Sequence, residues 1–439
     1  MRRDGRSLQL QSSPINAANL RGYGKAIGLS RSRSKDSIAM TKTSTSLDWV
    51  TTLVSYDTTS RNSNLELIDV MRQSLVAFDL DPVLVPNADG TKANLFVTIP
   101  AHDGSITGGI MLAGHTDTVP VDGQEWSSDP FVAEIRGDRL YGRGTADMKA
   151  FSGVILSMLP EFLERRLSAP LHLAFTYDEE VGCHGAVTLL AELAQRGISP
   201  DVCFVGEPTS MRPVSAHKSS YLYRVSVTGL ASHSSNTPNG VNAIEYAARA
   251  ITFIRQMADQ HRLTGPFDPS FEVAYTTANV GVIEGGVAVN TVADRCEFEF
   301  EFRTIPGVDP TEVIGAITHF VLGDLRVAMR EENAAADIRI DAIGAVPSLS
   351  AGGTGAGGTG VAGAGAALHL AQALTGSSAE DAVGYATEAG LFQLAGIDTA
   401  VCGPGSIRQG HTANEYVELA QIQACEEFML ALAEHLSAD

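Results

Sequence analysis

The chain has 439 residues, of which 44% are hydrophobic and 19% are charged, and its formal net charge at pH 7 is −20. This balance is typical of a globular protein with a sizeable core, and it excludes collagen-like, fully disordered and disulfide-scaffold chains. The excess of acidic residues argues against non-specific binding to nucleic acids, which depends on Lys and Arg neutralising phosphates. No apolar run is long enough to predict a membrane span. The five cysteines have no CxxC spacing, which predicts reduced thiols in the cytoplasm.

Short apolar runs alternate with helical patterns along most of the chain. Helical spacing predicts a first helix that begins near Ser46 behind a Ser/Thr cap, and a second helix over 64–80. Four later apolar runs are predicted strands, at 109–113, 171–177, 202–205 and 399–402. Helical patterns at 151–163 and 186–195 separate several of these strands. The alternation predicts an α/β fold with a mainly parallel sheet and helices on both faces.

The stretch 215–346 has a different pattern. Half-buried alternating runs and helical runs follow one another in it, at 221–229, 242–257, 294–303 and 311–329. The order strand, helix, two strands, helix, strand predicts a small α+β domain. It would be inserted into the larger catalytic domain, whose two parts would be 46–214 and 347–439.

Two segments have unusual compositions. Residues 1–45 are rich in Arg and Ser and poor in acidic residues, which predicts a disordered basic extension. A transit peptide and a true start at Met40 are the alternatives, whereas the lack of an apolar stretch argues against a secretory signal.

Residues 351–366 contain eight glycines in sixteen positions. Their match to GxGxxG follows no apolar strand, so a flexible connection is expected there rather than a nucleotide site.

Acidic and histidine side chains follow the predicted strands of the larger domain. The residues concerned are His115, the pair Glu179 and Glu180, Glu207, His411 and, at the start of a helix, Asp147. Since ligands bind beyond the carboxyl ends of the strands in open α/β sheets, these side chains are expected at one edge of the sheet. Imidazole and carboxylate ligands without thiolate are typical of a hydrolytic zinc or cobalt site. The set is large enough for two divalent metal ions, with Asp147 between them.

Two further roles follow from the spacing around these residues. Asp117 lies two residues after His115, so its carboxylate could accept the other imidazole N–H and fix the tautomer. Of the adjacent Glu179 and Glu180, one can bind metal and the other can act as general base. Cys183, which follows this pair, is interpreted as a packing residue.

The motifs together resemble those of the acetylornithine deacetylase and succinyl-diaminopimelate desuccinylase group of dinuclear metallo-amidohydrolases. The resemblance covers residues from about Ser46 to the C-terminus. The matching stretches are Gly114-His-Thr-Asp-Thr-Val-Pro120, Gly142-Arg-Gly-Thr-Ala-Asp-Met-Lys149, Asp178-Glu-Glu180, Gly206-Glu-Pro-Thr209, Ala231-Ser-His-Ser-Ser235, Gly240-Val-Asn-Ala-Ile244 and Gly403-Pro-Gly405 with His411.

This resemblance implies a ligand set for each metal ion. His115, Asp147 and Glu207 would bind one ion. Asp147, Glu180 and His411 would bind the other. The Asp that bridges the ions in this family precedes a cis peptide bond, which is therefore expected after Asp147.

The resemblance also implies the remaining roles. Glu179 would be the general acid and base. His233, on the inserted lid and dimerisation domain, would reach the partner subunit's site in a homodimer and stabilise the oxyanion. Asn290 and Arg303 would hold the substrate α-carboxylate, for which a guanidinium fork is suited. The backbone at Gly403 would line the pocket near the metal.

Several details favour the members of this group that hydrolyse the acetamide of N2-acetyl-L-ornithine, a step of arginine biosynthesis. They include Tyr385-Ala-Thr-Glu-Ala and Gly403-Pro-Gly-Ser-Ile. A desuccinylase of succinyl-diaminopimelate and a broader hydrolase of N-acyl amino acids are the alternatives with the same chemistry. A non-catalytic metal-binding or dimeric interaction protein is the alternative from another class. The sequence departs from the family at Ser219, where Gly is usual, and in the Gly-rich segment, but neither change removes a proposed ligand.

Overall fold

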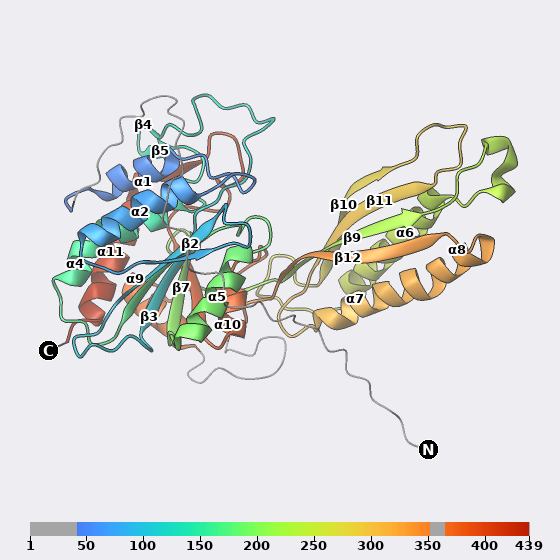
Figure 1. Ribbon diagram of the computed structural model, residues 1–439. Coiled ribbons are helices and arrows are strands. Elements are labelled where there is room, and N and C mark those ends of the chain that lie inside the picture. The colour runs from blue at the N-terminus through green and yellow to red at the C-terminus, as the bar shows by residue number, and fades with distance from the viewer. Residues whose placement is uncertain (1–41, 352–364, 439) are drawn as a thin grey trace, which may run out of the picture. The chain divides into compact units, whose positions relative to one another are not determined.

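The computed structural model describes residues 42–351 and 365–438 (Figure 1). Most of the predicted extension 1–45 and of the Gly-rich segment 351–366 lies outside these residues. Among the helices it describes, none has both the length and the apolar character that a bilayer crossing requires. All five cysteines are buried and free, as expected from their spacing.

An eight-stranded sheet carries the larger part of the fold, with the strand order β1-β2-β6-β3-β7-β14-β8-β13. The strands are β1 (Val83–Pro86), β2 (Ala93–Ile99), β3 (Ile110–His115), β6 (Leu171–Thr176), β7 (Val202–Pro208), β8 (Val214–His217), β13 (Asp381–Val383) and β14 (Asp398–Gly403). The four central strands β6, β3, β7 and β14 run parallel to one another, whereas β2 and β8 are antiparallel to their inner neighbours. The prediction of a mainly parallel sheet is confirmed, and its four central parallel strands are the apolar runs identified in the sequence; β8 and β13 also pair in parallel.

Helices cover both faces of this sheet. One hydrophobic cluster includes residues of α1 (Ser46–Val54), α2 (Leu65–Ala77), α3 (Lys149–Ser157), α4 (Leu159–Leu163), α9 (Ala366–Thr375) and α11 (Leu419–His435). A second cluster includes α5 (His184–Arg196) and α10 (Ala389–Leu394). Successive residues of a strand enter opposite clusters, as Leu173 and Ala174 do on β6. Because both faces are buried, these strands are continuously apolar rather than alternating.

Local sequence signals explain where several helices begin and end. Helix α1 starts after Thr45, whose side chain accepts the N–H of Asp48 while Asp48 accepts the N–H of Thr45. The single helix expected over 151–163 is two helices, α3 and α4. Pro160, near the start of α4, has no amide hydrogen with which to continue α3.

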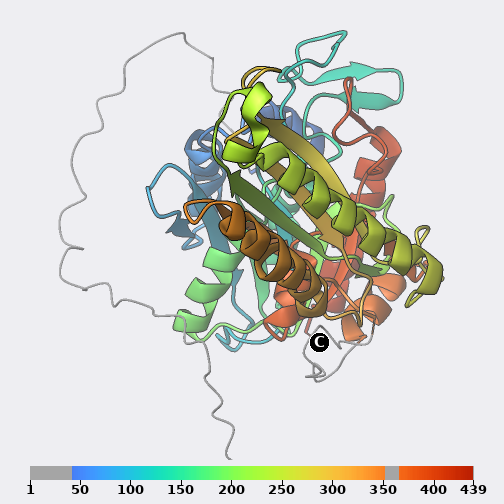
Figure 2. The ribbon, with the colours of Figure 1, turned by 90° about the vertical axis from the view of Figure 1, so that its right-hand side faces the viewer.

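A separate four-stranded sheet has the order β10-β11-β9-β12, and every neighbouring pair is antiparallel. Its strands are β9 (Ser220–Thr228), β10 (Thr277–Gly285), β11 (Arg295–Arg303) and β12 (Asp337–Val346). Every second side chain of β11 points into the core, and these four side chains are Cys296, Phe298, Phe300 and Phe302. Figure 2 shows the helices that pack on this face, which are α6 (Ala243–Thr264), α7 (Pro310–Thr318) and α8 (Arg326–Glu332).

The element order in this region is the expected one: strand, helix, two strands, helix, strand. The second helical run, predicted at 311–329, is not one regular α-helix. It consists of α7, a π-helical stretch over His319–Leu325, and α8. A short 3-10 helix, Ser234–Asn239, follows His233.

A small three-stranded sheet, β15-β5-β4, completes the architecture. Its strands are β4 (Glu134–Arg136), β5 (Arg139–Tyr141) and β15 (Tyr416–Glu418). The pairing of β5 with β15 brings the chain after residue 141 next to the chain before residue 416, and both segments contribute to the site described next.

Candidate metal centre

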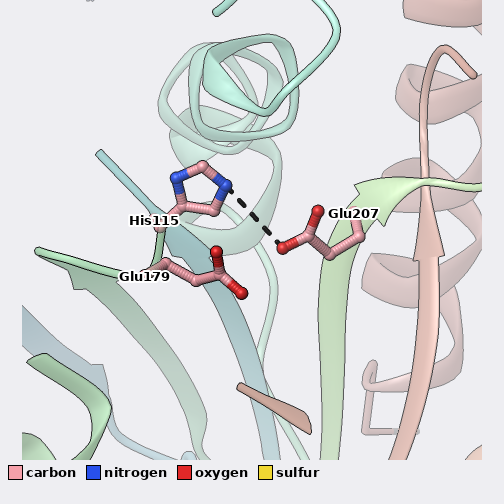
Figure 3. Close-up of side chains that lie close together, drawn as sticks. All are labelled: His115, Glu179 and Glu207. Carbon is pink, nitrogen blue, oxygen red and sulfur yellow. Dashed lines mark ion pairs between the residues drawn. The ribbon is translucent and has the colours of Figure 1, made fainter. Parts of the chain in front are cut away.

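His115 ends strand β3 and faces two carboxylates. Its Nε2 atom lies 2.9 Å from Oδ1 of Asp147 and 3.7 Å from Oε1 of Glu207. The imidazole is buried, with only 1% of the residue exposed. Figure 3 shows His115 and Glu207 directed toward each other, with the Glu179 carboxylate beside them. A histidine from one strand and carboxylates from neighbouring segments therefore converge at the carboxyl edge of the sheet, as the sequence predicts.

Asp147 also contacts a second histidine. Nε2 of His411 lies 3.2 Å from Oδ2 of Asp147 and 3.0 Å from Oε2 of Glu180. The two oxygens of Asp147 thus face different imidazoles, Oδ1 toward His115 and Oδ2 toward His411. Asp147 could therefore be shared between two cations. The peptide bond that follows Asp147 is cis, as the resemblance implies.

The two adjacent glutamates both reach the cluster. Possible ligand atoms of His115, Glu179 and Glu207 lie within 4.8 Å of one another, and so do those of His115, Asp147 and Glu180. Only Glu180 contacts His411 as well. The five residues predicted from the strand ends and Asp147, predicted at the start of a helix, are therefore gathered in one place.

Helix α3 packs very close to the sheet at this edge, because two strand residues that face it are glycines. Gly114 precedes His115 on β3, and Gly206 precedes Glu207 on β7. A Cβ added at Gly206 on β7 would come within 2.0 Å of the Phe151 ring. A Cβ added at Gly114 on β3 would lie 2.7 Å from the side chain of Met148. Asp147 lies two residues before α3, so the contact of α3 with the two glycines brings its carboxylate to the strand ends.

Asp117 connects three parts of the site. Its carbonyl oxygen lies 3.0 Å from Nδ1 of His115, closer than its carboxylate, which lies 3.6 Å away. The carboxylate instead accepts the hydroxyl of Ser60 at 2.6 Å. It also accepts the backbone N–H groups of Glu179 and Glu180, at 3.1 and 3.3 Å. Asp117 thus fixes the imidazole mainly through its backbone, and its side chain anchors the turn that carries both glutamates.

A buried ion pair that the sequence analysis missed supports the backbone of two ligands. Arg143 and Glu415 lie 2.6 Å apart, each with about 1% of its side chain exposed. The other oxygen of Glu415 accepts the N–H of Asp147 and that of the preceding residue. Arg143 also donates to Gln124, whose amide donates to the carbonyl of His411 at 2.8 Å. Arg143 lies within the Gly142-Arg-Gly motif, but nothing in the sequence pairs it with Glu415.

The cluster brings together several carboxylates, of which Asp117, Asp147 and Glu207 are buried. Burial and the neighbouring carboxylate of Asp147 raise the pKa of Glu207 well above its usual value, and they raise that of Glu180 to about 6. Burial also raises the pKa of Glu179 well above its usual value. Hydrogen bonds that His411 donates to the carboxylates of Asp147 and Glu180 raise the pKa of His411 to about 10.

The donor atoms fit divalent cations. Among the described residues, none donates a hydrogen bond to Oε1 of Glu207, although this atom is buried. A buried carboxylate oxygen without a donor is costly unless a cation binds it. The oxygens and imidazole nitrogens present are those that zinc, cobalt and related ions take as ligands.

Three of the predicted substrate residues have no contact with this cluster among the described residues. His233 is exposed and shares a hydrogen bond with the hydroxyl of Ser235, 2.7 Å away. Asn290 is exposed too. Arg303 forms an ion pair with Glu301 on the same strand, at 3.0 Å. Their roles stay predictions.

Gly403, in contrast, lies at the edge of the site. It ends β14, and its carbonyl accepts the N–H groups of Thr209 and Met211, at 3.2 and 2.9 Å. A Cβ added to it would lie 2.0 Å from the carbonyl of Gly206. The close approach of these two backbones holds the segment that follows Glu207.

Comparison with known proteins is consistent with this geometry. Residues 111–435 match the profile of peptidase family M20/M25/M40. An acetylornithine deacetylase from Proteus mirabilis is 35% identical over 381 residues, which cover 86% of this chain and 92% of that protein.

Solved structures share the fold at low sequence identity. A tripeptidase from Staphylococcus aureus has a TM-score of 0.67 and 22% identity, over 89% of this chain and 97% of that one. A dinuclear metal-binding peptidase of the M20 family from Bacillus subtilis has a TM-score of 0.60 and 15% identity, over 89% of this chain and 97% of that one. These likenesses support the α/β fold with a second, smaller sheet.

The contact of α3 with the sheet can be tested at Gly206. We expect Gly206→Ala to lower the free energy of unfolding by about 1–3 kcal/mol, because the added methyl overlaps the Phe151 ring. Gly315→Ala is the control, since an added Cβ there meets no atom within 4 Å and the residue lies in helix α7. It should be neutral or stabilising by up to about 1 kcal/mol. Urea unfolding measures both variants, and a Gly206→Ala protein as stable as wild type would contradict the close packing.

Proposed function

Since the chain belongs to peptidase family M20/M25/M40, and is therefore a hydrolase, we propose that it removes the acetyl group from N2-acetyl-L-ornithine. The products would be L-ornithine and acetate. The observation that supports this substrate is the 35% identity, over most of both chains, to a protein named acetylornithine deacetylase. The reaction would belong to arginine biosynthesis in the cytoplasm, with neither nucleic acid nor membrane as a partner.

We assign the cluster to two divalent ions, zinc or cobalt, with Asp147 shared between them. His115 and Glu207 would complete the ligands of one ion, and Glu180 and His411 those of the other. The contacts that support this division are those of Asp147 with both imidazoles and of Glu180 with His411. Bound ions would supply polarisation of the amide carbonyl and a lowered pKa for a water molecule.

Glu179 is the general base in this proposal. Its carboxylate lies beside His115 and Glu207, and burial raises its pKa above the usual value, which favours a carboxylate that accepts a proton. It would accept a proton from the attacking water and return it to the nitrogen of the leaving amine. Asp117 holds the Glu179 backbone during both transfers through the hydrogen bond at 3.1 Å.

Substrate recognition would use residues of the smaller sheet and its loops. The guanidinium of Arg303 and the amide of Asn290 would bind the α-carboxylate, and Arg303 would exchange its pairing with Glu301 for the substrate. His233 of one subunit would donate to the oxygen that becomes negative in the site of the other. The backbone at Gly403 would line the pocket. In this scheme residues 46–214 and 347–439 form the catalytic domain and residues 215–346 the lid and dimerisation domain.

The outer edge of β10 supports a homodimer. This strand ends the four-stranded sheet, so one side of its backbone has no partner strand among the described residues. Four exposed apolar side chains lie on it and on the loop that follows: Val282, Ile283, Val287 and Val289. An unpaired edge with apolar side chains is a surface on which a second copy of the chain can pack.

The substrate is tested by ornithine release from N2-acetyl-L-ornithine, using chelated protein with zinc or cobalt added back. We expect activity that depends on the metal, with kcat/KM at least about tenfold higher than for N-succinyl-diaminopimelate. Activity on the succinyl compound alone would contradict the acetyl specificity. No activity on either compound by metal-loaded protein would contradict the deacetylase function.

A shared active site predicts complementation between two inactive variants. His233→Ala and Glu179→Gln subunits, unfolded together and refolded, should form mixed dimers in which one of the two sites has both wild-type residues. If half of the dimers are mixed, activity should recover to about a quarter of wild type. Each variant refolded alone is the control. Recovery no greater than in those controls would show that His233 does not act on a partner's site.

A further inference from the structure

The turn that carries Glu179 folds back tightly on itself. The carbonyl of Glu179 accepts the backbone N–H groups of both Gly182 and Cys183, at 3.0 Å each. Cys183 has a φ of +55° and lies just before helix α5. Two further hydrogen bonds close the turn: the N–H of His184 donates to the carbonyl of Asp178, and the N–H of Gly185 donates to the carbonyl of Tyr177. The backbone therefore leaves the Cys183 side chain little freedom.

In this position the Cys183 sulfur lies against the carboxylate of Glu179. The distance from Sγ to Oε1 is 3.5 Å, shorter than the 3.8 Å to the Glu179 carbonyl. Among the residues that the structure describes, Cys183 is the one hydrogen-bond donor to this carboxylate. If the Cys183 side chain only filled space, an apolar side chain of the same size would serve, and no S–H group would be needed beside the carboxylate.

The thiol stays protonated and can donate. Only 2% of Cys183 is exposed, and it packs in the same apolar cluster as Ala186 and Leu189 of α5. Burial and the nearby Glu179 charge raise the pKa of the thiol well above its usual value. A thiol S–H is a weak donor, but a carboxylate is a strong acceptor.

We propose that Cys183 is a positioning residue, whose S–H group holds the Glu179 carboxylate in the orientation from which it accepts a proton from water. The proposal rests on the role of Glu179 as general base. It replaces the interpretation of Cys183 as a packing residue, because packing explains the burial of the side chain but not the contact of Sγ with Oε1. The thiol itself neither binds substrate nor takes part in the proton transfer.

The chain offers a matched control in Cys203. This residue is also free and buried and belongs to the same apolar cluster, on strand β7. The structure shows no hydrogen-bond acceptor for its thiol among the described residues. Cys203→Ala and Cys183→Ala therefore remove the same atoms from the same core, and only the second removes the contact with Glu179. Alanine keeps a Cβ at the positive φ of residue 183, so the backbone strain is unchanged.

The test compares metal-loaded wild type with Cys183→Ala, Cys183→Ser and Cys203→Ala, using N2-acetyl-L-ornithine. We expect Cys183→Ala to lower kcat about fivefold or more with KM and metal content unchanged, which is the loss of about one hydrogen bond. Cys203→Ala should keep the wild-type kcat. Cys183→Ser, which retains a donor, should recover part of the loss. Equal kcat values for the two alanine variants, or a serine variant no faster than Cys183→Ala, would overturn the proposal.

Infrared difference spectra give a readout that does not depend on turnover. The S–H stretching band of Cys183, isolated as wild type minus Cys183→Ala, should lie at lower frequency than that of Cys203, because its thiol donates to a carboxylate. Glu179→Gln should shift the Cys183 band upward and leave the Cys203 band in place. A Cys183 band that Glu179→Gln does not move would overturn the contact. Turnover retained by Glu179→Gln would instead overturn the general base, whatever the thiol does.

Discussion

The close contact between helix α3 and the sheet is the constraint on which the site depends. At Gly206 an added Cβ would overlap the Phe151 ring of α3, and at Gly114 it would crowd the Met148 side chain just before α3. These glycines directly precede Glu207 and His115. The helix therefore begins beside the strand ends, and Asp147 meets both His115 and His411.

This gathering of carboxylates has an electrostatic cost that the surrounding structure offsets only in part. Asp117 accepts three hydrogen bonds, and Glu415 is paired with Arg143 while it accepts two backbone N–H groups. Among the described residues, none donates a hydrogen bond to the buried Oε1 of Glu207, which faces His115 at 3.7 Å. The remaining charge is what divalent ions would neutralise, so the same arrangement that destabilises the metal-free cluster favours metal binding.

Much of the fold and the cluster could be predicted from the sequence, because both depend on local signals. Apolar runs that end in His or Glu mark parallel strands, and strand ends meet at one edge. Contacts between distant segments carry no such signal. Ser60 reaches Asp117 from a turn 57 residues earlier, and Arg143 pairs with Glu415 across 272 residues. The roles proposed for His233 and Arg303 would depend on a partner subunit and a substrate, which a single chain does not contain.

The most direct test of the account is the number of divalent ions bound per chain, measured by inductively coupled plasma mass spectrometry on desalted protein. The account predicts about two ions per wild-type chain, because the ligands form two sets that share Asp147. His411→Gln should reduce the number to about one, and Asp147→Asn should lower it further. A wild-type chain that binds no ion after incubation with zinc or cobalt, or an Asp147→Asn variant that still binds two, would contradict it.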